Sequence, residues 1–390
     1  MGDATLFFIT LAVLIIVSPM FSNITKLPIA VIEILLGSLA VWVGLLEADS
    51  EIFKSLSKIG FFYLMFLAGL EIDLKKFVAK REFLLKKALT YFVTIYLVAF
   101  IYYLVFDLNP IYIIAIPIVS LGMVMALINE QGKGFGWLEI VLIVGVMGEI
   151  LSITAIVIYK SVIYFGLGFE LYKNIAIFLA VLYLMYQALK LSNTLFWWYP
   201  ELKESIMPQN DSKSQSVRVS VALFIILIGI MNLLHIDMVL GAFFAGIFIA
   251  NFFEHKKDLP HTLHKVGFGF LVPLFFIYVG STLDLNLVFS AKILTNAFLI
   301  LLAIFSVRFI GANIAHSSHL SPSERLLLAF GDSMPLTFLI AISTIGYEAE
   351  LITKDEYLSF VLAGMLSGIV VMSIIKALIG RLYKKDATSS

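Results

Sequence analysis

The chain consists of long apolar segments separated by short polar breaks, and this pattern limits the folds open to it. A helix needs about 20 apolar residues to cross a bilayer, where backbone polar groups must be satisfied internally. Such segments lie at 4–20, 28–45, 56–70, 83–106, 111–128, 138–165, 174–191, 217–235, 236–253, 266–281, 293–315, 323–346 and 357–380. Apolar residues make up 61% of the sequence and charged residues 14%, unlike a globular domain. The sequence therefore predicts an all-α polytopic membrane protein with about 13 transmembrane helices.

Basic residues are concentrated in alternate loops, and this asymmetry predicts the orientation of the chain. Six lysines and arginines lie within 75–87, whereas the preceding loop, 45–51, reads LLEADSE. Because cytoplasmic loops are enriched in lysine and arginine, we expect the N-terminus outside the cell and the C-terminus in the cytoplasm. The expected location is the plasma membrane.

Charge and composition exclude several other classes of function. The formal net charge is zero, which gives no sign of a nucleic-acid partner, and the absence of cysteine excludes disulfides and thiol chemistry. The loops hold no cluster of nucleophile, general base and metal ligands. We therefore predict no enzyme, no cofactor, and no metal beyond a transported ion.

An internal repeat connects the two halves of the chain. The stretch FYLMFLAGLEIDLKKF (62–77) aligns with LFFIYVGSTLDLNLVF (274–289) when Gly69 is matched to Gly280. The shorter stretches EILLG and AFFAG align at nearly the same offset, with Gly37 on Gly246. One match of this length is weak, but a common offset favours a true repeat.

The number of segments between the two copies predicts that the repeat is inverted. Seven segments separate the copies, and an odd number places the second half upside down in the membrane, as in many secondary transporters. We predict one transporter domain, 1–390. It would contain two inverted six-helix repeats, 1–173 and 217–381, joined by a connector helix and cytoplasmic loop at 174–216.

The fifth and twelfth segments carry helix-breaking residues, and they are equivalent in the repeat. Inverted-repeat transporters bind their substrates where paired helices are broken near the membrane midplane. Ordinary kinked helices are the alternative, because proline and glycine are frequent in membrane spans. The coincidence with an intramembrane acid, Asp332, favours broken and crossing helices. The predicted break residues are Pro117, Gly122, Gly331 and Pro335.

Three ionisable residues lie within apolar segments, where a charge is costly and usually functional. Glu149 stands in the middle of the sixth segment, in VGVMGEILSI, with Ser152 one turn later. Arg308 is the basic residue near the middle of a segment, and it needs an anion because it stays protonated. Glu149 and Asp332 are the candidate partners, and stapling of two helices is the alternative role for Arg308.

Other ionisable residues are assigned ordinary positions. Glu33 and Glu139 lie near segment ends and are predicted to be interfacial or helix-end charges. Histidines at the cytoplasmic ends of segments are predicted to lie on the surface, although a pH-sensing role is open. These are His255, His261, His264, His316 and His319.

Several stretches resemble a known transporter family. FLAGLEIDLKKF (66–77), GAFFAGIFIANFFE (241–254) and VPLFFIYVGSTLDLN (272–286) are similar to signature stretches of the monovalent cation:proton antiporter-2 family. That family includes sodium/proton antiporters and the membrane domains of Kef-type potassium efflux systems. The resemblance implies thirteen spans in two inverted repeats and a homodimer. It also implies a dimerisation domain from spans one to three and eight to ten, and a mobile core from spans four to six and eleven to thirteen.

The resemblance also implies roles for individual residues. The acidic pair of the family's sixth span, Asp-Asp or Gln-Asp, falls on Gly148 and Glu149, and its span-eleven lysine falls on Arg308. Of the usual Ser-Thr pair in span five, Ser120 is kept and Leu121 replaces the threonine. Span five thus lacks a hydroxyl at Leu121, and span twelve has an additional acid at Asp332. These two changes suggest the hypothesis that a cation ligand has moved from the broken helix of span five to that of span twelve.

The predicted function is exchange of Na⁺ or K⁺ for H⁺, electroneutral because the sixth span holds a single carboxylate near its middle. The predicted ion and proton ligands are Glu149, Asp332, Ser120 and Ser333. Two alternatives stay open: a channel-like K⁺ efflux module regulated by a separate subunit, and a non-transporting membrane sensor. The altered acidic pair is compatible with each of them.

Overall fold

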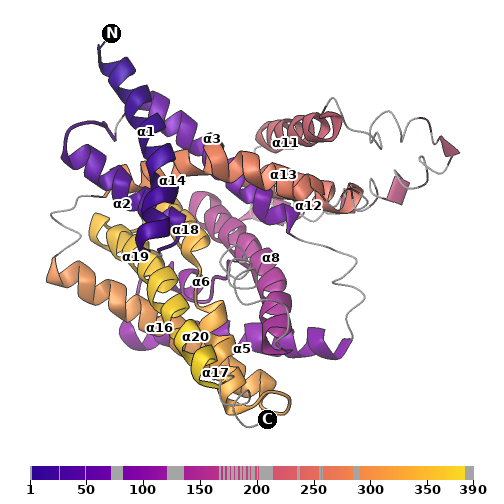
Figure 1. The fold of residues 1–390 in the computed structure, drawn as a ribbon. Coiled ribbons are helices and arrows are strands. Elements are labelled where there is room, and N and C mark those ends of the chain that lie inside the picture. The colour runs from indigo at the N-terminus through magenta and orange to yellow at the C-terminus, as the bar shows by residue number, and fades with distance from the viewer. Residues whose placement is uncertain are drawn as a thin grey trace. The chain divides into compact units, whose positions relative to one another are not determined.

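The regular structure of the protein is helical throughout the residues that can be described (Figure 1). The computed structural model describes residues 2–25, 27–48, 50–71, 82–120, 136–166, 214–234, 238–253, 258–283 and 290–382, with isolated positions at 256 and between 168 and 201. Two elements, η1 and η2, are single π-helical turns. The elements are α1 (Gly2–Thr25), α2 (Ile29–Trp42), α3 (Glu51–Leu70), α5 (Glu82–Phe106), α6 (Tyr112–Ala115), α8 (Gly136–Phe165), α11 (Gln215–Leu233), α12 (Met238–Phe252), α13 (Asp258–Val266), η1 (Gly267–Leu271), α14 (Val272–Ser281), α16 (Ala291–His316), α17 (Pro322–Asp332), α18 (Leu336–Glu348), α19 (Lys354–Leu366), η2 (Ser367–Val371) and α20 (Met372–Leu382).

These helices confirm the predicted all-α polytopic membrane protein. Within the described ranges, eight helices are long and apolar enough to cross a membrane, and the bent pair α17–α18 makes a ninth. α2 and α12 are shorter apolar helices of 14 and 15 residues. The predicted segments 111–128 and 174–191 extend outside the described residues, so the count of thirteen stays a prediction.

Three predicted boundaries differ from the structure by five residues or more. α1 continues to Thr25 instead of 20, and α3 begins at Glu51 instead of 56. The tenth segment was expected at 266–281, but its helix begins at Asp258 and continues through α13, η1 and α14 to Ser281. The added turns read DLPHTLHKV, and their polar and charged residues separate them from the apolar segment in the sequence. They still form a helix because one face is apolar, and its leucines Leu259 and Leu263 are buried.

The chain divides into two compact units, and each of them takes helices from both halves of the sequence. Unit 1 contains 1–24, 32–79 and 157–282; unit 2 contains 25–31, 80–156 and 283–390. This division corresponds to the grouping of spans that the family resemblance implies.

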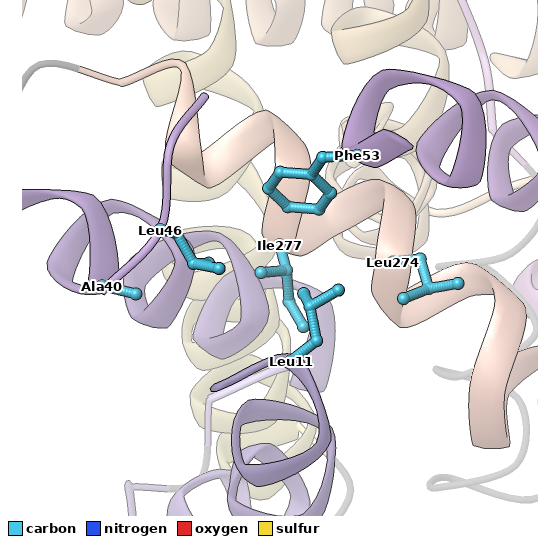
Figure 2. Close-up of a cluster of buried hydrophobic side chains, with 6 residues drawn as sticks. All are labelled: Leu11, Ala40, Leu46, Phe53, Leu274 and Ile277. Carbon is cyan, nitrogen blue, oxygen red and sulfur yellow. The ribbon is translucent and has the colours of Figure 1, made fainter. Parts of the chain in front are cut away.

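Unit 1 contains a compact apolar cluster. Phe53 of α3 packs there with residues of α1, α2 and α14 (Figure 2). Tyr278 meets the Phe53 ring edge-on, with 5.1 Å between ring centroids. The buried members are Leu11, Ala40, Leu46, Phe53, Leu274 and Ile277. Helices at the two ends of unit 1's sequence are thereby held together by dispersion and burial.

α3 and α12 cross at a pair of glycines. A Cβ atom at Gly69 would overlap the carbonyl oxygen of Phe243, and one at Gly246 would overlap that of Phe66. The two backbones therefore touch directly, as small residues permit in membrane helices.

α2 and α14 cross in the same way. A Cβ atom at Gly37 would overlap the carbonyl oxygen of Ile277, and one at Gly280 would overlap that of Ile34. Each glycine meets the carbonyl three residues before its partner glycine, as in the α3–α12 pair.

The two crossings use glycines that the sequence repeat aligns. Gly280 is the repeat mate of Gly69, and Gly246 is the repeat mate of Gly37. The alignment therefore places α3 on α14 and α2 on α12, so that the two crossings are equivalent in the predicted repeat. The contacts of these four glycines are therefore those that the predicted repeat requires.

The Gly69→Ala variant is expected to lower the thermal unfolding midpoint in detergent. Its methyl group would meet backbone that cannot move aside, and overpacking of this kind costs about 1–3 kcal/mol. Gly229→Ala in α11 is the matched control, because its added Cβ meets nothing within 4 Å and alanine favours a helix. Equal stability of the two variants would contradict the close crossing.

Candidate ion-binding site

The twelfth predicted segment is interrupted inside unit 2. α17 ends at Asp332 and α18 begins at Leu336, with a bend of 45° between them. Ser333 has φ −87 and ψ 32, outside helical geometry. Pro335, the N-cap of α18, has no N–H to donate, so the hydrogen-bond ladder stops here. The interruption exposes the polar backbone at the end of α17 within a buried setting.

The chain also leaves helical geometry within the fifth predicted segment. α6 ends at Ala115, Ile116 and Pro117 form a turn, and 118–120 have no regular structure. The carbonyls of this stretch therefore have no partners within a helix. Gly122, the other predicted break residue here, lies outside the described residues.

Arg308 of α16 satisfies the carbonyls at both interruptions. Its Nη1 donates to the Ile116 oxygen at 2.7 Å, and its Nη2 donates to the Ile118 oxygen. Its Nε donates to the Asp332 backbone oxygen at 2.9 Å. The side chain is fully buried. A planar guanidinium with five donors can hold several carbonyls at once, which an ammonium group cannot do in this geometry.

Asp332 is the acidic partner of this arginine. Its Oδ2 lies 3.5 Å from the Arg308 Nε and accepts a 2.7 Å hydrogen bond from the hydroxyl of Tyr91 in α5. Its Oδ1 is buried and has no hydrogen-bond partner among the described residues. Of the two predicted candidates for the Arg308 partner, the described ion pair is to Asp332.

Glu149 is buried in α8, with 1% of its surface exposed. Its neighbour Gly148 lies against Val119, because a Cβ there would come within 2.6 Å of the Val119 side chain. Ser152, one turn later, accepts a 2.9 Å hydrogen bond from the Val119 N–H. α8 therefore packs directly on the first interruption, and Glu149 lies on the helix segment that makes this contact.

The predicted hydroxyl ligands have different positions. Ser120 shares a 2.6 Å hydrogen bond with Thr337 in the first turn of α18, which joins the two interrupted segments. Ser333 is buried and donates to the Ala329 carbonyl at 2.6 Å. Gly331 is still within α17, where a Cβ would contact Val141 of α8 at 3.3 Å. Its role in the structure is close packing rather than the break itself.

The side chains and backbone groups around the interruptions are suited to binding a small hard cation or a proton. They offer carboxylate, hydroxyl and carbonyl oxygens, the ligands that hard cations prefer. No group of three or more His, Cys, Asp or Glu in the described ranges could hold a metal ion. The oxygen groups at the two interrupted segments can therefore bind and release an ion without any covalent chemistry.

The sequence of the chain matches a known family over nearly its whole length. The family described as "Sodium/hydrogen exchanger, transmembrane" matches residues 9–380. The chain belongs to the sodium/hydrogen exchanger family. This membership agrees with the resemblance found in the signature stretches of spans three, nine and ten.

Individual relatives of this exchanger-family chain support the same assignment. It is 26% identical to "Putative Na(+)/H(+) antiporter YjbQ" of Bacillus subtilis, covering 93% of this chain but only 60% of that protein. It is 25% identical to "Probable Na(+)/H(+) antiporter 3" of Methanocaldococcus jannaschii, covering 95% of each. The solved structure of the sodium proton antiporter MjNhaP1 from M. jannaschii covers 97% of each chain, with a TM-score of 0.67 and 13% identity. At that identity, the structural match shows the fold alone.

Two ionisable residues of this exchanger-family chain near segment ends are buried, and the prediction for the second of them is wrong. Glu33, near the start of α2, is 3% exposed and lies 3.4 Å from the hydroxyl of Ser18 within unit 1. His316 is not a surface residue: it is 2% exposed, with its ring 6.3 Å from that of Tyr91. Position near a segment end does not report burial, because neighbouring helices can cover that end.

Proposed function

We propose that this chain exchanges Na⁺ or K⁺ for H⁺ across a membrane, with Glu149 as the exchanging carboxylate. The observation that carries the proposal is a buried set of charges, Glu149, Asp332 and Arg308, at two interrupted segments of unit 2. Family membership and the names of the two relatives point to the same activity.

The charges give a physical reason for coupled exchange. Arg308 is always protonated and balances the charge of Asp332, so these two groups together add no net charge. Glu149 is then the group that changes state. With a proton or a monovalent cation bound, the site is neutral; empty, it carries a buried charge that opposes movement through a low dielectric. The site therefore moves only when loaded, which gives exchange of one cation for one proton.

The cation would need further oxygen ligands besides Glu149. Asp332, Ser120 and Ser333 are the candidates from the sequence, and Thr337 joins them through its hydrogen bond with Ser120. The altered Gly148–Glu149 pair leaves one acid at these two positions, so a second carboxylate on α17 would restore the number of an Asp-Asp pair.

The remaining parts of the proposal concern movement and setting. We propose alternating access in which unit 2 carries the ion, a homodimer, and a plasma-membrane location with the C-terminus in the cytoplasm. The division into units and the basic loop at 75–87 support these points.

Cation-driven proton movement in proteoliposomes tests the function directly. Adding Na⁺ or K⁺ outside vesicles that hold an acidic interior and a pH-sensitive dye should collapse the pH gradient, whereas choline should not. A membrane potential set by a thiocyanate gradient should leave the rate unchanged if exchange is electroneutral. Cation flux without proton movement would favour the channel reading, and no flux with any cation would favour the sensor.

A further inference from the structure

We propose that Tyr91 is a positioning residue of the exchange site: its hydroxyl fixes one oxygen of Asp332, so that the other, Oδ1, faces the transported ion. This inference rests on the proposed function and adds to it a residue and an atom. Nothing in the sequence pattern of the fourth segment indicates such a role, because tyrosine is common in membrane helices.

The hydrogen bond between Tyr91 and Asp332 is short and completely buried. The hydroxyl lies 2.7 Å from Oδ2, and the tyrosine side chain has no exposed surface. Tyr91 belongs to α5 and Asp332 to the end of α17, 241 residues later in the sequence. In a dry setting a bond to an ionised group is stronger than a neutral one, so it can hold the carboxylate in a single orientation.

The helix packed against α5 has a recess that fits the tyrosine ring. Gly311 of α16 faces this ring, and a Cβ there would lie 3.0 Å from Cδ2 and 3.1 Å from Cε2 of Tyr91. The same Cβ would lie 2.7 Å from a methyl group of Ile95. A side chain at position 311 would therefore displace the ring, and with it the hydroxyl.

The two oxygens of Asp332 consequently differ. Oδ2 is held by the Tyr91 hydroxyl and faces the Arg308 Nε at 3.5 Å, whereas Oδ1 has no hydrogen-bond partner among the described residues although it is buried. A buried carboxylate oxygen without a donor is costly unless an ion, a proton or water completes its shell. Asp332 is the last residue of α17 before the interruption, so we infer that the transported ion completes this shell at the break.

The bond also biases what Asp332 binds. A donor on Oδ2 stabilises the ionised carboxylate over the protonated one, which keeps Oδ1 available to a cation. Tyr91 and Arg308 contact Asp332 directly, and the ring of His316 lies against that of Tyr91. Tyr96 of α5 interacts electrostatically with Arg308, and Glu149 of α8 is the other acid of the proposed site. From α8, the uncharged residues Val141 and Trp137 face the adjacent Gly331.

The Tyr91→Phe variant tests the proposal, because it keeps the ring and removes the hydroxyl. In proteoliposomes we expect the half-saturating cation concentration to rise about tenfold near neutral pH, and the acid limb of the rate–pH profile to move about one unit upward. At high pH the variant should approach the wild-type rate. Tyr96→Phe is the matched control: it lies on the same helix, and its buried hydroxyl has no hydrogen-bond partner in the described part of the chain.

The outcomes separate this proposal from the proposed function. If wild-type protein shows no cation-driven proton movement, the exchange function itself fails. If wild type exchanges but Tyr91→Phe only lowers the rate equally at every pH, the residue is structural and the positioning role is wrong. Combining Tyr91→Phe with Asp332→Asn should add no further shift of the pH profile to that of Asp332→Asn alone; an independent shift would overturn the proposal.

Discussion

The Glu149→Gln variant is expected to lose cation-driven proton movement down to the level of empty liposomes. The amide keeps the shape of the side chain but can neither release a proton nor neutralise a cation. Because Glu149 is 1% exposed in α8, its carboxylate is enclosed by protein, and the amide would leave no titratable group at this position. The measurement is the collapse of a pH gradient after addition of Na⁺, K⁺ or Li⁺. Equal amounts of protein are reconstituted, and the unfolding midpoint of the variant is compared with that of the wild type.

Two control variants sharpen this result. Glu149→Asp keeps a carboxylate of the kind that the family resemblance implies at this position, so it should exchange, with changed cation affinity. Glu33→Gln removes another buried glutamate, in unit 1, and should retain exchange. Full activity of Glu149→Gln would transfer the exchange role to Asp332. Equal loss in Glu33→Gln would show that the assay reports folding instead.

The positions of the helices could be predicted from the sequence, because burial in lipid leaves an apolar signature in every span. The predicted segments at 83–106 and 293–315 correspond to α5 (Glu82–Phe106) and α16 (Ala291–His316) within two residues. The signature fails where a helix is amphipathic: α13 was missed because its polar face dominates the hydropathy.

The charged residues of the site could also be predicted, because a charge in an apolar segment is conspicuous. Asp332 was one of two candidate partners for Arg308, but the other contacts of these residues could not be predicted. The hydroxyl of Tyr91 lies in a segment rich in aromatics, and Thr337 has no distinctive sequence context. The guanidinium of Arg308 donates its hydrogen bonds mainly to backbone carbonyls, and every residue has a carbonyl, so the sequence does not distinguish the acceptors. Only the fold shows that one side chain meets both interrupted segments.

The Arg308→Met variant is expected to destabilise the protein strongly and to abolish exchange. It would leave the carboxylate of Asp332 without its ion-pair partner, and the carbonyls of Ile116 and Ile118 without their donor. Removing one member of a buried ion pair typically costs about 3–5 kcal/mol, because the remaining charge is uncompensated. The unfolding midpoint in detergent should fall accordingly.

A double variant distinguishes the two losses. Arg308→Met with Asp332→Asn removes the unpaired charge, so it should recover part of the lost stability, but the carbonyls would still lack a donor and exchange would stay absent. Arg308→Lys should be more stable than Arg308→Met, since it keeps the charge, yet it cannot bridge both interrupted segments as the guanidinium does. If the double variant were no more stable than Arg308→Met, the carbonyl contacts rather than the ion pair would account for the role of Arg308. Arg308 would then act by binding the carbonyls of the two interrupted segments, and Asp332 would be available to bind the transported ion.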